Sequence, residues 1–202
     1  MNDDLRAAST WEGIYTSGEA GWDLGAAAPP FEDLLATPPE WLAPGRLVNP
    51  GCGRGHDAAF FAARGFDVTA VDFADTAITA ARAYAEAAPR LDVVQADLFD
   101  LPSLGVAPFD LWLEHTCFCA IPVERRPEYA EVARAMVRPG GVVFGLFYRF
   151  DPPDDAGPPF ALSETELLAT FADGFERLAL ETPHRSHAAR QGRERLAAFR
   201  RR

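Results

Sequence analysis

The sequence contains no lysine: all 19 of its basic residues are arginine, and 30 acidic residues outnumber them to give a formal net charge of −11. An acidic chain lacks the phosphate-neutralising surface on which general nucleic-acid binding depends. The stretch 177–202 is basic, with eight arginines against two glutamates, a pattern more typical of a solvated C-terminal element than of a binding site. We therefore expect no nucleic-acid partner.

Cysteine is scarce, and long hydrophobic runs are absent. Cys52 lies in a glycine loop and Cys117 and Cys119 are one residue apart, which suits neither a disulfide framework nor a tetrahedral zinc site. No run approaches the roughly 20 apolar residues that a membrane helix needs. The acidic start, MNDDLRAAST, lacks the apolar segment of a secretory signal. We therefore expect a cytoplasmic protein with no metal and no membrane partner.

From residue 46 onward, continuous apolar runs alternate with helical patterns, as in a parallel sheet that is buried on both faces. The 202 residues fit one structural domain. The sequence predicts an α/β, Rossmann-like fold with a mostly parallel seven-stranded sheet and helices on both faces. Strands are expected over 46–50, 66–73, 91–99, 109–118, 142–150, 175–182 and 194–202; helices over 56–65, 74–88, 124–137 and 163–172; a turn over 138–141 and a loop over 151–159.

Residues 1–45 differ from this pattern and are rich in tryptophan and proline. We expect an extension with one short helix near 31–36, packed over the ligand-binding edge of the domain formed by 46–202. Over 8–28, four glycines accompany two tryptophans, and glycine at that density does not suit a rigid helix. The segment 8–28 is therefore predicted to be a lid that closes on a ligand, with a static extension as the alternative.

Glycine recurs at Gly51, Gly53 and Gly55, after a predicted strand and before a predicted helix. At such a turn, glycine lets the backbone approach a ligand at the carboxyl end of a strand. The dinucleotide fingerprint needs glycine where His56 stands, so an NAD-linked oxidoreductase is the weaker alternative. The observed spacing is similar to the first motif of S-adenosylmethionine-dependent methyltransferases, although a simple glycine turn would have the same pattern.

Acidic residues follow the next two predicted strands. Asp72 can accept hydrogen bonds from ribose hydroxyls, or it can cap the helix that begins near residue 74. In the methyltransferase fold, the loop that would hold Asp97 and Leu98 supplies a polar contact and an apolar wall for adenine, although a simple loop acid is equally consistent with Asp97. Phe73, beside Asp72, is assigned to the same site.

Six segments of the chain, taken in their order along the sequence, resemble the thiopurine methyltransferase superfamily, closest to its halide/thiol methyltransferase branch. The resemblance covers residues 11–199. The segments are WEGIYTSGEAGWDLG, LVNPGCGRGHD, VTAVDFADTAI, HTCFCAIPVERRPEYA, AGPPF and RQGRERLAAF.

The resemblance implies S-adenosylmethionine as the cofactor and S-adenosylhomocysteine as its product. Tyr148 matches an active-site tyrosine of the halide/thiol branch, although a core tyrosine at a strand end is equally consistent. Tyr15 stands where a further tryptophan is common. The sequence departs from the family pattern at Leu24, Asn49 and His115. Positions that match cofactor-contacting residues are Trp11, Trp22, Gly51, Asp72, Asp97, Leu98 and His115.

The implied reaction is methyl transfer to a small sulfur nucleophile, such as hydrosulfide or a thiol, or to a halide. These nucleophiles need no strong base, so we expect alignment and water exclusion rather than a catalytic triad. Thiopurines or other small S, N or O acceptors remain alternatives, as does a non-catalytic cofactor-binding protein. We expect a monomer. His184, Arg185 and His187 either contact the acceptor or lie on the surface.

Overall fold

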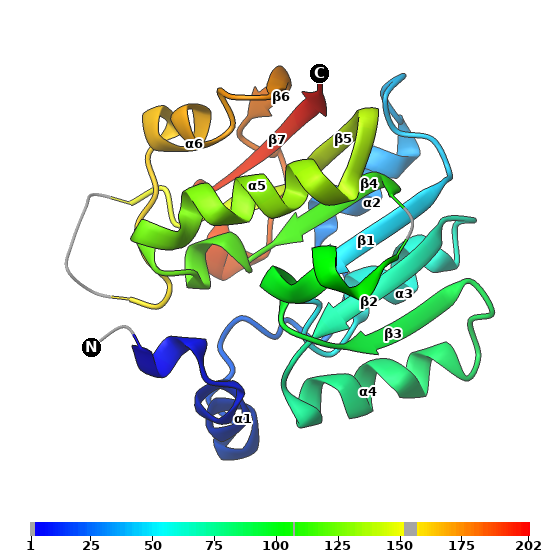
Figure 1. Ribbon diagram of the computed structural model, residues 1–202, viewed down its shortest axis with the longest axis vertical. Coiled ribbons are helices and arrows are strands. Elements are labelled where there is room, and N and C mark those ends of the chain that lie inside the picture. The colour runs from blue at the N-terminus through cyan, green and yellow to red at the C-terminus, as the bar shows by residue number, and fades with distance from the viewer. Residues whose placement is uncertain (1–2, 107, 152–156) are drawn as a thin grey trace.

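A seven-stranded sheet forms the centre of the structure, a computed structural model that describes residues 3–106, 108–151 and 157–202 (Figure 1). The strand order is β3-β2-β1-β4-β5-β7-β6. Neighbours are parallel except at β7, which runs antiparallel to β5 and β6, and the mostly parallel sheet is confirmed. The strands are β1 Arg46–Pro50, β2 Asp67–Asp72, β3 Leu91–Gln95, β4 Phe109–His115, β5 Val137–Tyr148, β6 Phe175–Glu181 and β7 Glu194–Arg201.

Helices cover both faces because the central strands carry buried apolar side chains on both sides. On one face lie α5 and α6 (Figure 1). There, Tyr129 of α5 and Phe171, the residue after α6, pack in a cluster with Trp112 of β4. On the other face, Phe31 of α2 and Phe61 of α3 pack around β5. The α-helices are α1 Ala8–Ser17, α2 Pro29–Ala36, α3 His56–Ala62, α4 Asp75–Ala85, α5 Arg126–Met136 and α6 Glu164–Thr170. The 3-10 helices are η1 Asp3–Arg6, η2 Leu98–Leu104, η3 Phe118–Ala120, η4 Val123–Arg125 and η5 Ala188–Arg190.

The N-terminal segment contains more helix than the sequence predicts. The helix expected near 31–36 is present as α2, but the expectation that glycine prevents a rigid helix is wrong for residues 8–17, which form α1. Gly13 is the one glycine inside α1, and Gly18 ends the helix at a φ of 78°, where a residue without a Cβ is favoured. Glu12 holds α1 against α4, because its carboxylate accepts the Thr76 N–H at 2.9 Å.

Several predicted boundaries move. The turn expected at 138–141 is part of β5, because Val137 pairs with Phe109 before the register shifts. The strands expected to reach residues 99 and 118 end at Gln95 and His115, because 3-10 turns begin there. The loop expected over 151–159 lies partly outside the described residues.

None of the helices in the described ranges is long and apolar enough to cross a bilayer.

Candidate active site

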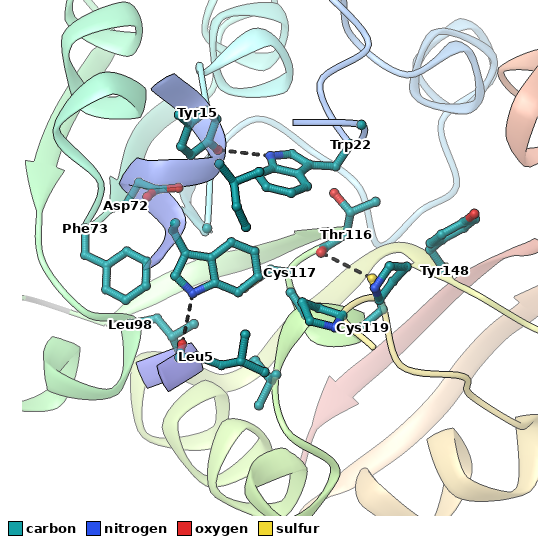
Figure 2. Close-up of a pocket in the computed structure, with 18 of the residues that line it drawn as sticks. Leu5, Tyr15, Trp22, Asp72, Phe73, Leu98, Thr116, Cys117, Cys119 and Tyr148 are labelled. Carbon is teal, nitrogen blue, oxygen red and sulfur yellow. Dashed lines mark hydrogen bonds between the residues drawn. The ribbon is translucent and has the colours of Figure 1, made fainter. Parts of the chain in front are cut away.

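The carboxyl ends of β1 to β5 meet at one edge of the sheet because these strands are parallel. A cavity of about 630 Å³ lies at this edge. In Figure 2, Asp72 and Phe73 lie at one end of the cavity and Tyr148 at the other, with Trp22 and Thr116 between them. The predicted site residues that line the cavity are Trp11, Tyr15, Trp22, Gly51, Asp72, Phe73, Asp97, Leu98 and Tyr148.

Gly51 brings the loop after β1 against the loop after β4. Its φ is 59°, and a Cβ at this position would lie 2.6 Å from the Sγ atom of Cys117. A side chain would therefore strain the backbone and also displace Cys117. The glycine keeps this part of the cavity floor open.

Asp72 is the last residue of β2. It is buried from bulk solvent and lines the cavity. One carboxylate oxygen accepts the Gly53 N–H at 2.9 Å and the other accepts the Ala74 N–H at 3.0 Å. Burial raises the pKa of this carboxyl, while these backbone donors oppose the rise. Asp72 thus fixes the turn before α4 but does not cap the helix itself, because α4 has Ala74 as its N-cap residue and its Thr76 N–H is bonded by Glu12. The remaining lone pairs of Asp72 can accept ribose hydroxyls.

Three aromatic residues of the N-terminal segment cover the cavity. The ring of Trp22 meets Trp11 at 5.5 Å and Tyr15 at 5.4 Å between centroids, both edge to face. Trp22 Nε1 donates to the Tyr15 hydroxyl at 3.1 Å, and Trp11 Nε1 donates to the Leu5 carbonyl at 2.9 Å. These bonds fix the rings as a wall that can exclude water and hold a cation against aromatic faces.

The loop after β3 supplies the wall below Asp72. Asp97 accepts the Phe99 N–H at 3.0 Å and so begins η2, while Leu98 and Phe99 pack toward the core from the cavity lining. The guanidinium of Arg125 lies 3.5 Å from the Phe99 ring centroid.

These groups fit S-adenosylmethionine. Asp72 offers acceptors for a diol, Gly51 presents backbone without a side chain to the cavity, and Phe73 and Leu98 offer apolar contacts. The aromatic cover suits a sulfonium cation.

A buried carboxylate orders the turn after β4. Glu114 accepts the Phe118 N–H at 2.9 Å and the Tyr129 hydroxyl at 2.8 Å. Burial raises the pKa of Glu114 to about 7, against the effect of these donors. The turn places Thr116 in the cavity wall at a φ of 59°, an uncommon conformation for a β-branched residue.

Two cysteines of this turn line the cavity. Burial, with the nearby Glu114 carboxylate, raises the pKa of Cys119 to about 12 and that of Cys117 well above its usual value. Cys117 and Cys119 therefore remain neutral thiols at physiological pH.

Three predicted cofactor residues do not belong to this lining. Gly53 and Gly55 lie in the turn that begins α3, and Gly53 contributes through its bond to Asp72. His115 lies against a separate cavity of about 40 Å³ beside the glycine loop, where Asp57 also lies. A direct contact of His115 with the cofactor stays a prediction.

The loop before β7 contains His184, Arg185 and His187, whose roles the sequence leaves open, and places them in different surroundings. His187 lines the cavity. Arg185 instead pairs with Glu32 at 2.9 Å and Asp33 at 2.7 Å, so it joins this loop to α2. Contact between the acceptor and His184 or His187 stays untested.

Sequence reasoning missed Thr116, Arg190 and Arg193 as members of the cavity wall. Both arginines lie in the segment RQGRERLAAF, so the family resemblance marks the region without giving them a role. Neither its residue type nor the periodicity of the sequence indicates that Thr116 has a positive φ.

The fold and the site define an S-adenosylmethionine-dependent methyltransferase. The family model described as thiopurine S-methyltransferase (TPMT) matches residues 6–201. The chain belongs to this family, which confirms the resemblance and excludes the NAD-linked alternative.

Curated relatives match most of the chain. Thiocyanate methyltransferase 1 of Brassica oleracea is 29% identical over 197 residues, covering 94% of this chain and 83% of the relative. Probable thiol methyltransferase 2 of Arabidopsis thaliana is 28% identical with the same coverage. Thiopurine S-methyltransferase of Aliivibrio fischeri strain MJ11 is 31% identical over 177 residues, covering 80% of this chain and 81% of the relative.

A solved structure agrees in fold. The Burkholderia thailandensis 1,6-didemethyltoxoflavin-N1-methyltransferase, crystallised with S-adenosylhomocysteine, has a TM-score of 0.79 at 24% identity and covers 96% of this chain and 86% of its own. The shared architecture confirms the Rossmann-like methyltransferase fold.

Proposed function

We propose that the protein transfers the methyl group of S-adenosylmethionine to a small anionic acceptor: hydrosulfide, a small thiolate or a halide. The environment of Tyr148 carries this proposal. The guanidinium carbons of Arg190 and Arg193 lie 5.3 and 5.2 Å from the centroid of its ring. Arg193 pairs with Asp151 and Arg190 lies 3.6 Å from Glu194, but neither carboxylate belongs to the cavity lining. The charged groups that this end presents to an acceptor are therefore basic, which favours an anion.

The carboxylates of the cavity lining lie elsewhere. Among the described residues they are Glu19 of the N-terminal segment and Asp72 and Asp97, which follow β2 and β3. In the sheet order, β1 and β4 separate β2 from β5. Among the described lining residues, Asp72 and Asp97 therefore lie toward the cofactor together with Arg125, whereas the charged groups beside Tyr148 are the arginines Arg190 and Arg193.

When bound, the cofactor supplies a methyl group on a sulfonium cation. Asp72 would hold the ribose, and the wall formed by Trp11 and Trp22 would exclude water. The hydroxyl of Tyr148 would donate to the acceptor anion and align it. No general base is required, because hydrosulfide and thiols exist in solution partly as anions, and the anion can bind directly.

Two relatives, a thiocyanate methyltransferase and a probable thiol methyltransferase, support this acceptor class. Thiopurines are the second candidate. They are favoured by the 31% identity to a thiopurine S-methyltransferase.

A turnover screen with methyl-labelled S-adenosylmethionine tests the proposal. Hydrosulfide, small thiols, iodide, thiocyanate and thiopurines are compared at equal concentration, with S-adenosylhomocysteine release as a second readout. We expect the small anions to be methylated with the highest kcat/KM. A strong preference for thiopurines would overturn the proposed acceptor.

We also propose that residues 1–45 act as a lid over the domain formed by 46–202, and that the protein acts as a cytoplasmic monomer on a small-molecule acceptor without nucleic acid. The free thiols of Cys52, Cys117 and Cys119 support a reducing compartment. Sedimentation of the protein with and without S-adenosylhomocysteine tests the monomer.

A further inference from the structure

Arg190 is a buried arginine at the point where four segments of the chain meet. It ends η5, directly before β7, and only 5% of its side chain is exposed. Its nearest carboxylate is Glu194 at 3.6 Å, longer than a direct charge-assisted hydrogen bond. Burial of a guanidinium is costly unless its donors are satisfied, so the other partners of Arg190 show why it is there.

Those partners are a backbone carbonyl and a ring nitrogen. One terminal nitrogen of Arg190 donates to the Trp22 carbonyl at 2.7 Å, and the other lies 2.6 Å from His115 Nε2. Because arginine can only donate, the Nε2 atom of His115 accepts, and the ring proton belongs on Nδ1.

The other side of this imidazole leads back to the N-terminal segment. His115 Nδ1 donates to Asp57 at 2.6 Å, and the second carboxylate oxygen of Asp57 accepts the Ala28 N–H at 2.9 Å. The stretch 22–28 is therefore held at both ends by one buried chain of hydrogen bonds that runs Arg190, His115, Asp57.

The same guanidinium faces the acceptor end of the cavity through the Tyr148 ring, 5.3 Å away. Arg190 thus contacts the carbonyl of Trp22, whose indole covers the cofactor site, and also the ring proposed to align the acceptor. Lysine could not replace it, since a single ammonium group cannot present two diverging planar donors.

We propose that Arg190 is a positioning residue that, through His115 and Asp57, fixes the stretch 22–28 over the cofactor site and links this cover to Tyr148. Only the link to Tyr148 rests on the proposed function. The hold on the cofactor cover does not depend on which acceptor is used.

The first test compares Arg190→Lys with Arg185→Lys. Arg185 is a matched control from the same loop, because it also bonds to the N-terminal segment but lies 52% exposed at the surface. Calorimetry with S-adenosylhomocysteine should show an affinity loss of about tenfold or more for Arg190→Lys, as expected when a buried charged hydrogen bond is lost. Arg185→Lys should bind as the unaltered protein does, and the change in tryptophan fluorescence on binding should shrink only in Arg190→Lys.

A double-mutant cycle separates positioning from general destabilisation. If Arg190 and Asp57 act as one unit, Arg190→Lys and Asp57→Asn should weaken S-adenosylhomocysteine binding non-additively, whereas Arg185→Lys and Asp57→Asn should be additive. Additivity of the first pair would overturn the proposal. So would an Arg190→Lys protein with unaltered cofactor affinity and only a raised acceptor KM, because Arg190 would then be an acceptor-binding residue.

Should Arg190→Lys fail to fold, hydrogen exchange on the unaltered protein decides. S-adenosylhomocysteine should slow exchange in 22–28 and in 188–190 together. Protection of 22–28 without 188–190 would contradict the link. If the small anions are not methylated but Arg190→Lys and Asp57→Asn still act non-additively on cofactor binding, the proposed acceptor is refuted and the inference about Arg190 stands.

Discussion

The Sγ atom of Cys117 lies where a side chain on Gly51 would begin, 2.6 Å from the position of a Cβ. Two loops that follow β1 and β4 therefore meet with no space between them. This contact sets the floor of the cavity, and it gives a direct test of how tightly the cavity is built.

Gly51→Ala should destabilise the fold and abolish cofactor binding, because it combines a positive φ with the Cys117 overlap. Gly65→Ala is the matched control: its φ is 94°, and nothing lies within 4 Å of its Cβ position. We expect a loss of about 1–2 kcal/mol for the control, from backbone strain alone, and about 1–3 kcal/mol more for Gly51→Ala, from overpacking. Denaturant unfolding measures both, and equal losses would contradict the close approach.

Asp72→Ala should weaken S-adenosylhomocysteine binding from the micromolar range expected of such a site, by roughly 2–4 kcal/mol, because two charge-assisted hydrogen bonds to the ribose are lost. Asp67→Ala is the control at the other end of β2, where the carboxylate is exposed and pairs with Arg90. Calorimetry should show no change in affinity for Asp67→Ala. Normal binding by Asp72→Ala, or clear NAD binding by the unaltered protein, would contradict the cofactor site.

Tyr148→Phe should lower turnover with hydrosulfide and small thiols while leaving the affinity for S-adenosylhomocysteine nearly unchanged. The reason is that the hydroxyl is proposed to align the acceptor and has no part in holding the cofactor. Steady-state kinetics and calorimetry on the same preparation separate the two effects. Unchanged turnover of Tyr148→Phe with every acceptor would show that the Tyr148 hydroxyl has no role in the reaction.

Thiol methylation should become faster as pH rises through the pKa of the acceptor thiol, because the thiolate is the nucleophile. The cavity's own thiols should stay unmethylated over the same range, since burial keeps the pKa of Cys119 near 12 and that of Cys117 high. Intact-protein mass spectrometry after many turnovers checks this. A mass gain at either cysteine would show that these thiols ionise.

Glu114 should make the stability of the fold fall as pH rises. Its pKa is raised by burial from 4.5 to about 7, so the folded state binds the proton more tightly than the unfolded state between these values. Relative to the unaltered protein, Glu114→Gln should gain up to about 3 kcal/mol in free energy of unfolding from acid to neutral pH. If the difference in free energy of unfolding between the two proteins stays constant across this pH range, Glu114 ionises normally.

Residues 8–28 should exchange amide hydrogens more slowly when S-adenosylhomocysteine is bound, if the lid opens and closes. The contacts that would break on opening include the pairs of Asp23 with Arg54 at 2.7 Å and with His56 at 3.0 Å. They also include the hydrogen bonds of Glu12 with the Thr76 N–H, of Arg190 with the Trp22 carbonyl and of Asp57 with the Ala28 N–H, and the packing of Tyr15 against Ala74 and Ala77. Removing residues 1–25 should leave a folded domain with much weaker cofactor binding. Equal exchange with and without ligand would favour a static cover.

The sequence predicted the strands well because alternation and apolar runs reflect burial, which the central sheet imposes strongly. It also located Gly51, Asp72 and Tyr148 at the edge of the sheet, since each follows or ends an expected strand. It did not predict α1, because the count of glycines over 8–28 hid the fact that Gly18 ends the helix and Gly21 lies beyond it. Nor did it predict the partners of His115, which come from residues distant in the chain.

The bond from Arg190 to the Trp22 carbonyl joins residues 168 positions apart. Loop closure over such a distance is entropically costly, and the two residues can meet only after the intervening strands have assembled. During folding, the covered cavity should therefore form late, after the core of the sheet. Catalytic competence would then report completion of the fold, and a collapsed intermediate with native secondary structure would still lack activity.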